Sequence, residues 1–234
     1  MTKGRNPSIA ESTTPAGEPT RADQTRATLI RAALRLFGTQ GFDGTSTRDI
    51  AAAANANIGS IAYHFGGKEG LHEACARHIV ETMQELARPV LTALPDAGSL
   101  QPDQAEALLR LALERMAGFV IGQPEAGAIV SFILRELDRP TAALDTVYTG
   151  VFEPVHRRFC EVWAAATGED AESDATKIRV FTLIGQVIYF RIGREAVRRR
   201  MGWDRVGEAE TAQVVEAAQA NLAAILAASH GKRS

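Results

Sequence analysis

The stretch STRDIAAAANANIGSIAYHFGGKEG, from Ser46 to Gly70, predicts two short helices around a tight turn. Ser46 and Asp49 have the spacing in which side chains and backbone amides cap each other, so a helix is expected to begin at Thr47. The alanines at positions 51–54 combine high helix propensity with little bulk, which lets another helix pack close to this one. Together these features predict a helix-turn-helix.

The second helix of this unit is expected to begin near Ile58. Asn55 is assigned to the turn, because asparagine tolerates left-handed backbone geometry, and Asn57 is assigned to the N-cap. The helical period then places three polar or aromatic side chains on one face, namely Ser60, Tyr63 and His64. The opposite face is apolar, so this helix is expected to pack on one side and to expose a reading surface on the other.

These residues resemble the N-terminal domain of the TetR family of transcriptional repressors over a continuous block from about Arg26 to Leu71. An amphipathic first helix ending in Phe37 is followed by the Gly41-Phe42 turn. Residues 45–51, 57–65 and 66–71 are similar to the family's second helix, its recognition helix and the entry to its fourth helix. The chain departs from the family at Asn55, where glycine is common, and at Ala62, where tyrosine is common.

The resemblance implies a role in DNA binding for eight residues. Thr47 and Asn57 would contact phosphates, Gly59 would allow close approach to the DNA backbone, and Lys68 would hold a phosphate after the Gly66-Gly67 bend. Base edges would be read by Arg48, Ser60 and Tyr63, and His64 would bond a phosphate or pack against the turn. Taken singly, each of these residues is more often structural or solvated, but the coherent block favours the DNA-binding interpretation.

Charge is distributed unevenly along the chain. Residues 1–68 hold eight Lys or Arg against five Asp or Glu, and the remainder holds eighteen against twenty-three, which together give the net charge of −2. A locally basic N-terminal segment on an acidic protein is typical of a selective DNA reader rather than of a general polyanion binder. Most of the DNA affinity is expected to be salt-sensitive.

Composition indicates a reducing, cytoplasmic context and more than one domain. The 234 residues exceed what a small DNA-binding module needs, and the two cysteines, Cys75 and Cys160, are too far apart in sequence to suggest a disulfide framework. Residues 1–20 are rich in Pro, Gly, Ser and Thr and lack a signal-peptide core, so a disordered tail is expected. No apolar run of transmembrane length is recognised, and no membrane partner is expected.

The whole chain is predicted to be all-α, with a DNA-binding three-helix bundle at residues 21–68 and a larger effector-binding and dimerisation domain at residues 69–234. After the helix-turn-helix, the expected helices cover residues 68–94, 103–121, 125–137, 141–166, 174–192 and 208–229. Pro89 is a point where the first of these can break. Pro154 is expected to kink the helix at 141–166, because proline removes a backbone donor.

The last two expected helices carry apolar stripes that predict a dimer interface. The stripe residues are Val180, Ile184, Val187, Ile188, Val214, Val215, Ala218, Leu222, Ile225 and Leu226. Part of both stripes is expected to serve the intrachain core instead. The family resemblance favours a homodimer, because TetR-like repressors pair these helices into a four-helix bundle whose two-fold symmetry matches a palindromic double-stranded operator.

Several segments of the second half resemble the C-terminal domain of the CecR-like branch of the family, among them residues 135–137, 140–145, 152–156 and 198–203. This resemblance implies a small-molecule pocket whose occupant changes the spacing of the two DNA-reading heads. Candidate lining residues are aromatic or adaptable side chains with a few polar anchors: Met83, Met116, Phe119, Phe132, Arg135, Phe152, His156, Phe159, Trp163, Gln186 and Tyr189. Each of them, taken alone, is more often plain core.

Two other functional classes compete with this interpretation. His72, Cys75 and His78 lie three residues apart, which suggests a transition-metal sensor, but steps of three drift around a helix and do not converge without further ligands. No nucleophile motif, metalloprotease motif, P-loop or dinucleotide fingerprint indicates an enzyme. The sequence therefore predicts a ligand-responsive homodimeric repressor with no metal, cofactor or catalytic site; a transcriptional activator or a metal-responsive sensor of the same fold is the alternative.

Overall fold

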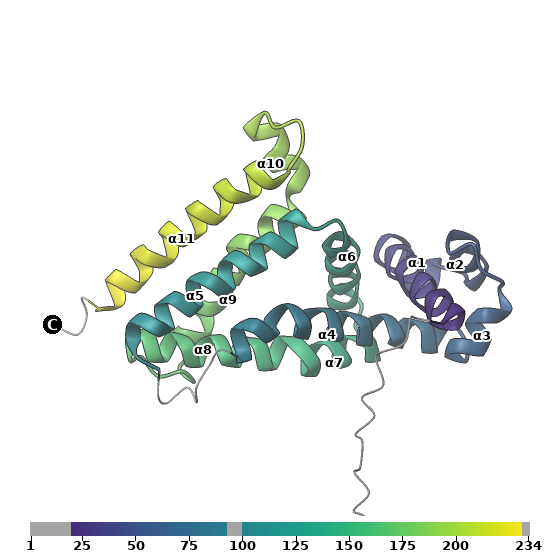
Figure 1. The fold of residues 1–234 in the computed structure, drawn as a ribbon, viewed down its shortest axis with the longest axis horizontal. Helices are drawn as coiled ribbons and strands as arrows, with labels where there is room; N and C mark the ends of the chain where they lie inside the picture. Colours follow the sequence, from purple (N-terminus) through teal and green to yellow (C-terminus); the bar gives the residue numbers. More distant parts are fainter. Residues whose placement is uncertain (1–19, 93–99, 231–234) are drawn as a thin grey trace, which may run out of the picture.

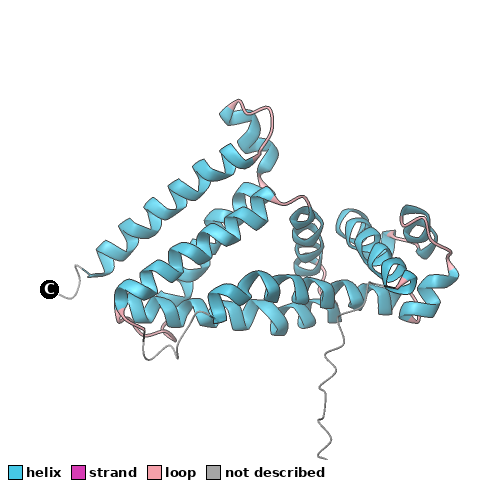
Figure 2. Ribbon diagram, viewed as in Figure 1, coloured by secondary structure: helices cyan, strands magenta, loops and turns pink. Residues whose placement is uncertain are grey.

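A computed structural model describes residues 20–92 and 100–230, and every regular element in these two ranges is helical (Figures 1 and 2). The elements in chain order are α1 (Arg21–Gly44), α2 (Thr47–Ala53), α3 (Gly59–Phe65), α4 (Lys68–Thr92), α5 (Pro102–Ala117), η2 (Gly118–Gly122), α6 (Glu125–Asp138), α7 (Ala142–Val147), η3 (Tyr148–Phe152), α8 (Glu153–Thr167), α9 (Asp174–Ile192), α10 (Arg194–Met201) and α11 (Glu208–His230). The all-α expectation is confirmed.

The long first helix begins at a reciprocal cap. Thr20 Oγ1 accepts from the Asp23 amide at 3.2 Å, and Asp23 Oδ2 accepts from the Thr20 amide at 3.0 Å. Near its other end α1 is interrupted at Gly41, whose φ of 77° is left-handed. The Gly-Phe turn recognised in the sequence is therefore a real break before Phe42.

The part of the chain after α3 follows the expected helices with two differences. The predicted helix at 141–166 is divided into α7, the π-helical turn η3 and α8, so that Pro154 falls in the first turn of α8, where its missing N–H is tolerated. A short helix that was not predicted, α10, connects α9 to α11. The helix α4 continues through Pro89, and its expected end at Leu94 lies outside the described residues.

Two apolar cores hold the chain together. The head core joins α1, α2 and α3 to α4, α6 and α7 through buried side chains that include Leu29, Phe37, Ile50, Ile61, Leu71, Ile79 and Phe132. The distal core joins α5, α8, α9 and α11 through side chains that include Leu113, Val120, Trp163, Val180, Val187, Val214 and Leu222. Phe119, in the π-helical turn η2, packs against both cores. The two cores therefore meet at η2.

Helix α6 connects the N-terminal helices to the rest of the protomer. In Figure 1 it stands between α1 and the diagonal pair α5 and α9. The two helices α1 and α6 cross closely, because a Cβ at Gly38 would lie 2.9 Å from Ser131 Cβ. Arg135 on α6 also donates through Nη2 to the Thr39 carbonyl at 2.9 Å. These contacts tie α1 firmly to α6.

No single helix within residues 20–92 and 100–230 is long and apolar enough to cross a membrane. In the same two ranges, Pro102–Gly122 and Glu125–Asp138 reach the required length and composition only when taken together, across a bend of 93°.

Candidate nucleic-acid interface

The helix-turn-helix begins at the residues that the sequence indicated. Ser46 Oγ accepts from the Asp49 amide at 3.1 Å, and α2 starts at Thr47. Ile50 is fully buried, while Arg48 on the opposite side of α2 is exposed. One face of α2 therefore packs in the head core, and the other is open to a ligand.

The turn between α2 and α3 depends on two asparagines. Asn55 has a φ of 49° and is the one non-glycine residue with positive φ in the part of the chain that the structure describes. Asn57 Oδ1 accepts from the Gly59 amide at 2.8 Å and so bonds the first residue of α3. The helix begins at Gly59 with Ile58 as its N-cap, one residue later than expected. The side-chain oxygen of Asn57 is thus bonded to the start of α3.

Helix α3 buries one face and exposes the other. Ile61 is 1% exposed in the head core, whereas Tyr63 is 83% exposed. The rings of Tyr63 and His64 meet edge to face, with centroids 4.9 Å apart. Of the other residues predicted on this surface, Gly59 is exposed and Ser60 is half-buried. The most exposed side chain on the outer face of α3, Tyr63, is therefore not covered by other parts of the chain.

Lys68 occupies the first turn of α4, directly after the glycine bend. Its Nζ lies 4.3 Å from the centroid of the Phe42 ring, so the ammonium group is held against the head by a cation–π contact. Thr47 at the start of α2 is half-buried. The eight predicted DNA-binding residues come from α2, the turn, α3 and the start of α4.

The joint between α3 and α4 requires glycine. Gly66 ends α3 in left-handed geometry with a φ of 75°, and its amide donates to the Ala62 carbonyl at 3.0 Å. A Cβ at Gly70 would lie 1.9 Å from the Phe65 carbonyl oxygen. The start of α4 is therefore pressed against the end of α3, and no larger residue fits at position 70 without moving one of the two helices.

A buried polar pair lies behind this joint. His72 Nε2 is 3.2 Å from Glu136 Oε1, with both side chains nearly inaccessible, and Glu136 Oε2 accepts from the Thr141 hydroxyl at 2.6 Å. The His72 ring also contacts the rings of Phe37 and Phe132. Burial lowers the pKa of His72 below its ordinary value, outweighing the opposite effect of the Glu136 carboxylate. Neutral His72 therefore joins α4 to α6 inside the head core.

The residues predicted to line a ligand pocket do not form one cluster. Met83, Phe119, Phe132 and Phe152 pack in or against the head core, and Met116, Phe119, Phe159 and Trp163 pack in or against the distal core. Trp163 is fully buried, and its Nε1 donates to Glu169 Oε2 at 3.0 Å. The Arg135 side chain donates hydrogen bonds to carbonyls of α1, and Tyr189 is 59% exposed. Among these residues Phe119 is the one that packs against both cores.

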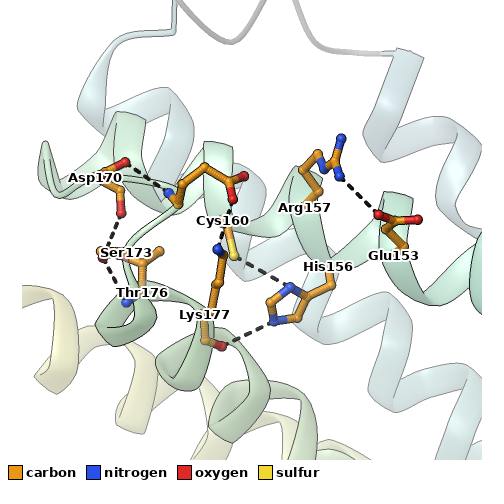
Figure 3. A network of polar contacts seen from close by, with 9 residues as sticks. Glu153, His156, Arg157, Cys160, Asp170, Ser173, Thr176 and Lys177 are labelled. Carbon is orange, nitrogen blue, oxygen red and sulfur yellow. Dashed lines mark hydrogen bonds and ion pairs between the residues drawn. The ribbon is translucent and has the colours of Figure 1, made fainter.

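His156 takes part in a polar network between α8 and α9 (Figure 3). Its Nε2 lies 3.2 Å from the Lys177 carbonyl oxygen, and its Nδ1 lies 3.7 Å from Cys160 Sγ. The ring stacks on Phe181, with centroids 3.9 Å apart. Burial raises the pKa of the Cys160 thiol. His156 therefore braces α9 from inside the protomer.

Two clefts occur among the described residues near the predicted sites. One, of about 290 Å³, lies between α9 and α11 and includes Gln186 in its lining. Gln186 Oε1 accepts from Asn221 Nδ2 at 3.0 Å, while Gln186 Nε2 is buried without a partner. The other, of about 330 Å³, lies between α1, α4 and α6. Gln186 is the one predicted pocket residue that lines either cleft.

The predicted dimer residues divide between the interior and the surface. Six of the ten are buried in the distal core, namely Val180, Val187, Val214, Ala218, Leu222 and Leu226. These six are assigned to the intrachain core, because neighbouring helices of the same chain already cover them. Ile184, Ile188, Val215 and Ile225 are half-buried beside them. The sequence pattern identified an apolar face correctly but not the neighbour that covers it.

The structure exposes a different apolar face of α9. Ile178, Phe181, Tyr189 and Ile192 are 63%, 62%, 59% and 54% exposed. Helix α9 is therefore apolar on two opposite faces, and only one of them is covered by its own chain.

The three residues of the metal-sensor alternative point to separate surroundings. His72 pairs with Glu136, Cys75 Sγ lies 3.8 Å from the Ile30 carbonyl oxygen, and His78 lines the cleft beside α1. Within residues 20–92 and 100–230 no group of three or more His, Cys, Asp or Glu side chains could hold a metal ion. The alternative therefore has no site in the described residues.

Two sequence families match this chain. The family described as bacterial regulatory proteins, tetR family, matches residues 29–75, and the C-terminal domain of the HTH-type transcriptional dual regulator CecR matches residues 105–229. CecR of Shigella flexneri is 35% identical over 214 residues, which cover 88% of this chain and 93% of that protein. BetI of Burkholderia thailandensis is 40% identical over 58 residues, 25% of this chain and 30% of that protein.

Solved structures share the fold. A TetR-like transcriptional regulator from Rhodococcus sp. RHA1 superposes with a TM-score of 0.60 at 21% identity, covering 88% of this chain and 99% of the other. AibR, solved in complex with isovaleryl coenzyme A and operator DNA, has a TM-score of 0.59 at 18% identity and covers 84% of this chain and 96% of its own. The chain belongs to the TetR family of bacterial transcriptional regulators and carries a C-terminal domain of the CecR type.

Proposed function

We propose that this protein is a homodimeric repressor that binds a palindromic operator and is released from it by a small molecule. In this proposal residues 21–68 form the DNA-binding head, and residues 69–234 bind the effector and the second chain. The observation that carries the proposal is the free face of α3, where Tyr63 is 83% exposed beside a capped and tightly packed helix-turn-helix. A rigid scaffold with an uncovered reading face is what groove recognition needs.

The proposed role of each residue in the DNA-binding head follows from its position on the helices. Tyr63, with Arg48 and Ser60, is proposed to meet base edges, because these side chains project from the two helices of the motif. Thr47, Asn57 and Lys68, with the backbone at Gly59 and the ring of His64, are proposed to hold phosphates. The residues that contact phosphates set the affinity for DNA, and the residues that read base edges set the sequence specificity.

The experiment for the head compares Tyr63→Ala with Lys68→Ala on DNA from upstream of the protein's own gene. Loss of a phosphate contact at Lys68 should weaken binding to all sequences and reduce the salt slope by about 1. Loss of Tyr63 should cost roughly 1–3 kcal/mol of binding free energy and relax specificity, with little change in slope. Unchanged affinity and slope in both variants would falsify the assigned roles.

The effector is proposed to bind where the two cores meet. Phe119 packs against both cores, Met83 and Phe152 pack against the head core, and Met116 packs against the distal core. The two phenylalanines lie in the π-helical turns η2 and η3. Single π-helical turns are frequent at functional sites, because the extra residue gives the helix an alternative packing. From this position a ligand would act on α4 and α6, both of which contact the head.

Thermal unfolding tests for an effector. A ligand that binds only the folded protein raises the midpoint by mass action. The panel would combine aromatic and drug-like compounds with isovaleryl coenzyme A, which is the ligand present in the AibR structure. A compound that stabilises the unmodified chain and Leu134→Ala, but not Phe152→Ala, supports the proposed site. Equal stabilisation of all three places the ligand elsewhere.

The homodimer is proposed to form through α9 and α11. Support comes from the uncovered apolar face of α9, which includes Phe181 and Tyr189, and from the need for two heads on a palindromic operator. Activation is a second candidate, because the 35% identical relative is described as a dual regulator. Transcription assays on the operator-bearing promoter separate repression from activation by the sign of the change.

A further inference from the structure

The uncovered face of α9 has a pattern that reads the same in both directions. Its exposed apolar side chains, Ile178, Phe181, Tyr189 and Ile192, lie seven and four residues on either side of Gly185. Gly185 is itself exposed, and a Cβ added there would have no atom within 4 Å. Reversal of the helix about this glycine exchanges Phe181 with Tyr189 and Ile178 with Ile192.

We infer that two copies of α9 cross antiparallel at Gly185, so that Phe181 of each protomer packs against Tyr189 of the other. This inference rests on the proposed homodimer and adds the position of its two-fold axis. In a two-fold interface, residue i contacts j while j contacts i, so a face symmetric about one residue complements itself there. Glycine at the crossing permits the closest approach of the two helices.

The register is favoured because it buries apolar groups and leaves charges outside. A crossing centred two residues earlier, at Leu183, would set Tyr189 opposite Lys177 and Ile192 opposite Asp174 of the partner. Burying such charges without partners is costly. Centred on Gly185, each large apolar side chain of the face meets another one.

Both aromatic side chains are already held from inside the protomer. The Phe181 ring stacks on His156, with centroids 3.9 Å apart, and Tyr189 leans over Gly193, where a Cβ would lie 3.1 Å from its Cζ. Their rotamers are therefore restricted before association, which reduces the entropy lost when the two chains meet. Outward-facing aromatic pairs of this kind also dominate interface energetics.

The size of the surface suits a stable pair. An aromatic side chain spans roughly 200 Å² and is about 60% open here, so the four side chains together expose on the order of 450 Å² per protomer. A standard interface buries about 800 Å² per partner. Across the α9–α11 cleft, helix α11 adds exposed alanines, of which Ala224 lines the cleft; the others are Ala217, Ala220 and Ala228. Figure 1 shows α11 at the edge of the molecule, running along the diagonal pair α5 and α9.

Cysteine cross-linking tests the crossing point. In an antiparallel pair packed 8–10 Å apart, the two copies of residue 185 approach within disulfide range, whereas the two copies of residue 181 are separated by about 12 Å along the helices. Gly185→Cys should therefore form a covalent dimer with diamide. Phe181→Cys and Tyr189→Cys should each remain uncross-linked, and the Phe181→Cys/Tyr189→Cys double variant should cross-link.

The unmodified chain is the control, because Cys75 and Cys160 are buried at 0% and 2% exposure. Circular dichroism checks that each variant is folded, and Gly185→Leu, which needs no oxidation, should dissociate the dimer by preventing close approach. A dimer in sedimentation that cross-links efficiently through Phe181→Cys alone, or not at all through Gly185→Cys, overturns the crossing but leaves the homodimer. An unmodified chain that stays monomeric at all concentrations, and binds DNA as a monomer, overturns the homodimer itself.

Discussion

Helices α3 and α9 each leave one face uncovered by their own chain, but the two faces differ in chemistry. The open face of α3 is short, polar and aromatic, with Tyr63 as its most exposed side chain. The open face of α9 is long and apolar, and its inner face is buried in the distal core through Val180 and Val187. Burial alone cannot distinguish the two helices, whereas the character of the open face can.

The difference in chemistry between the two open faces indicates a different kind of partner for each helix. Polar and aromatic groups next to helix N-termini suit phosphates and base edges, where hydrogen bonds are exchanged rather than lost. An apolar face of several hundred Å² is unfavourable in water and suits another apolar surface. The two functions are therefore expected to respond to separate substitutions.

Phe181→Asp should have the largest effect. A carboxylate in the centre of the proposed interface would meet its partner's apolar face, so the dimer should dissociate. Operator affinity should then fall by a factor of about 100 or more, because the second head loses its high effective concentration. Sedimentation velocity and a DNA-binding titration measure the two consequences. Leu137→Asp, at a side chain 54% exposed on α6, is the matched control and should remain dimeric.

Gly70→Ala should have the next largest effect, confined to the head. The added methyl group would lie 1.9 Å from the Phe65 carbonyl oxygen, so α3 must shift relative to α4. Operator affinity is expected to fall by about 10-fold to 100-fold, in line with the 1–3 kcal/mol typical of overpacking. The dimer should persist. Gly118→Ala, where a Cβ meets no atom within 4 Å, should bind DNA normally. An equal loss of operator affinity in both variants would contradict the steric role assigned to Gly70 between α3 and α4.

A smaller effect is expected from pH. Burial lowers the pKa of His72 in the folded chain, so the unfolded chain takes up protons first as pH falls below the ordinary value of 6.5. The free energy of unfolding should therefore be fully retained above that pH and decrease below it. Chemical denaturation of the unmodified chain and His72→Gln at pH 7.5 and pH 5.5 tests this. A His72→Gln variant with the same pH dependence would show that other groups are responsible.

The sequence predicted much of the fold because its signals are local. Caps such as Ser46 with Asp49, the left-handed Asn55, and breakers such as Pro154 act within a few residues of themselves. Helix α9 was predicted with its observed bounds, Asp174–Ile192. Helix α10 was missed because its sequence is dominated by charge and has no apolar stripe; its Arg198 and Arg199 both bond Glu195.

Sites that depend on packing could not be predicted in the same way. Periodicity found an apolar stripe on α9 but could not tell that its own chain buries Val180 and Val187 and leaves Phe181 and Tyr189 open. The expected pocket residues were likewise divided between two cores, because an aromatic side chain on a helix has no local signal for its neighbour. Only the three-dimensional contacts identify Phe119 as the residue shared by both cores.

The central claim is that DNA binding and self-association reside on separate faces. Sedimentation velocity of the Tyr63→Ala/Lys68→Ala double variant, mixed with fluorescent operator DNA, tests it most directly. The account predicts a particle with the mass of two chains that leaves the DNA free at concentrations where the unmodified chain saturates it. A double variant that sediments as a monomer, or that binds the operator as the unmodified chain does, would contradict the account.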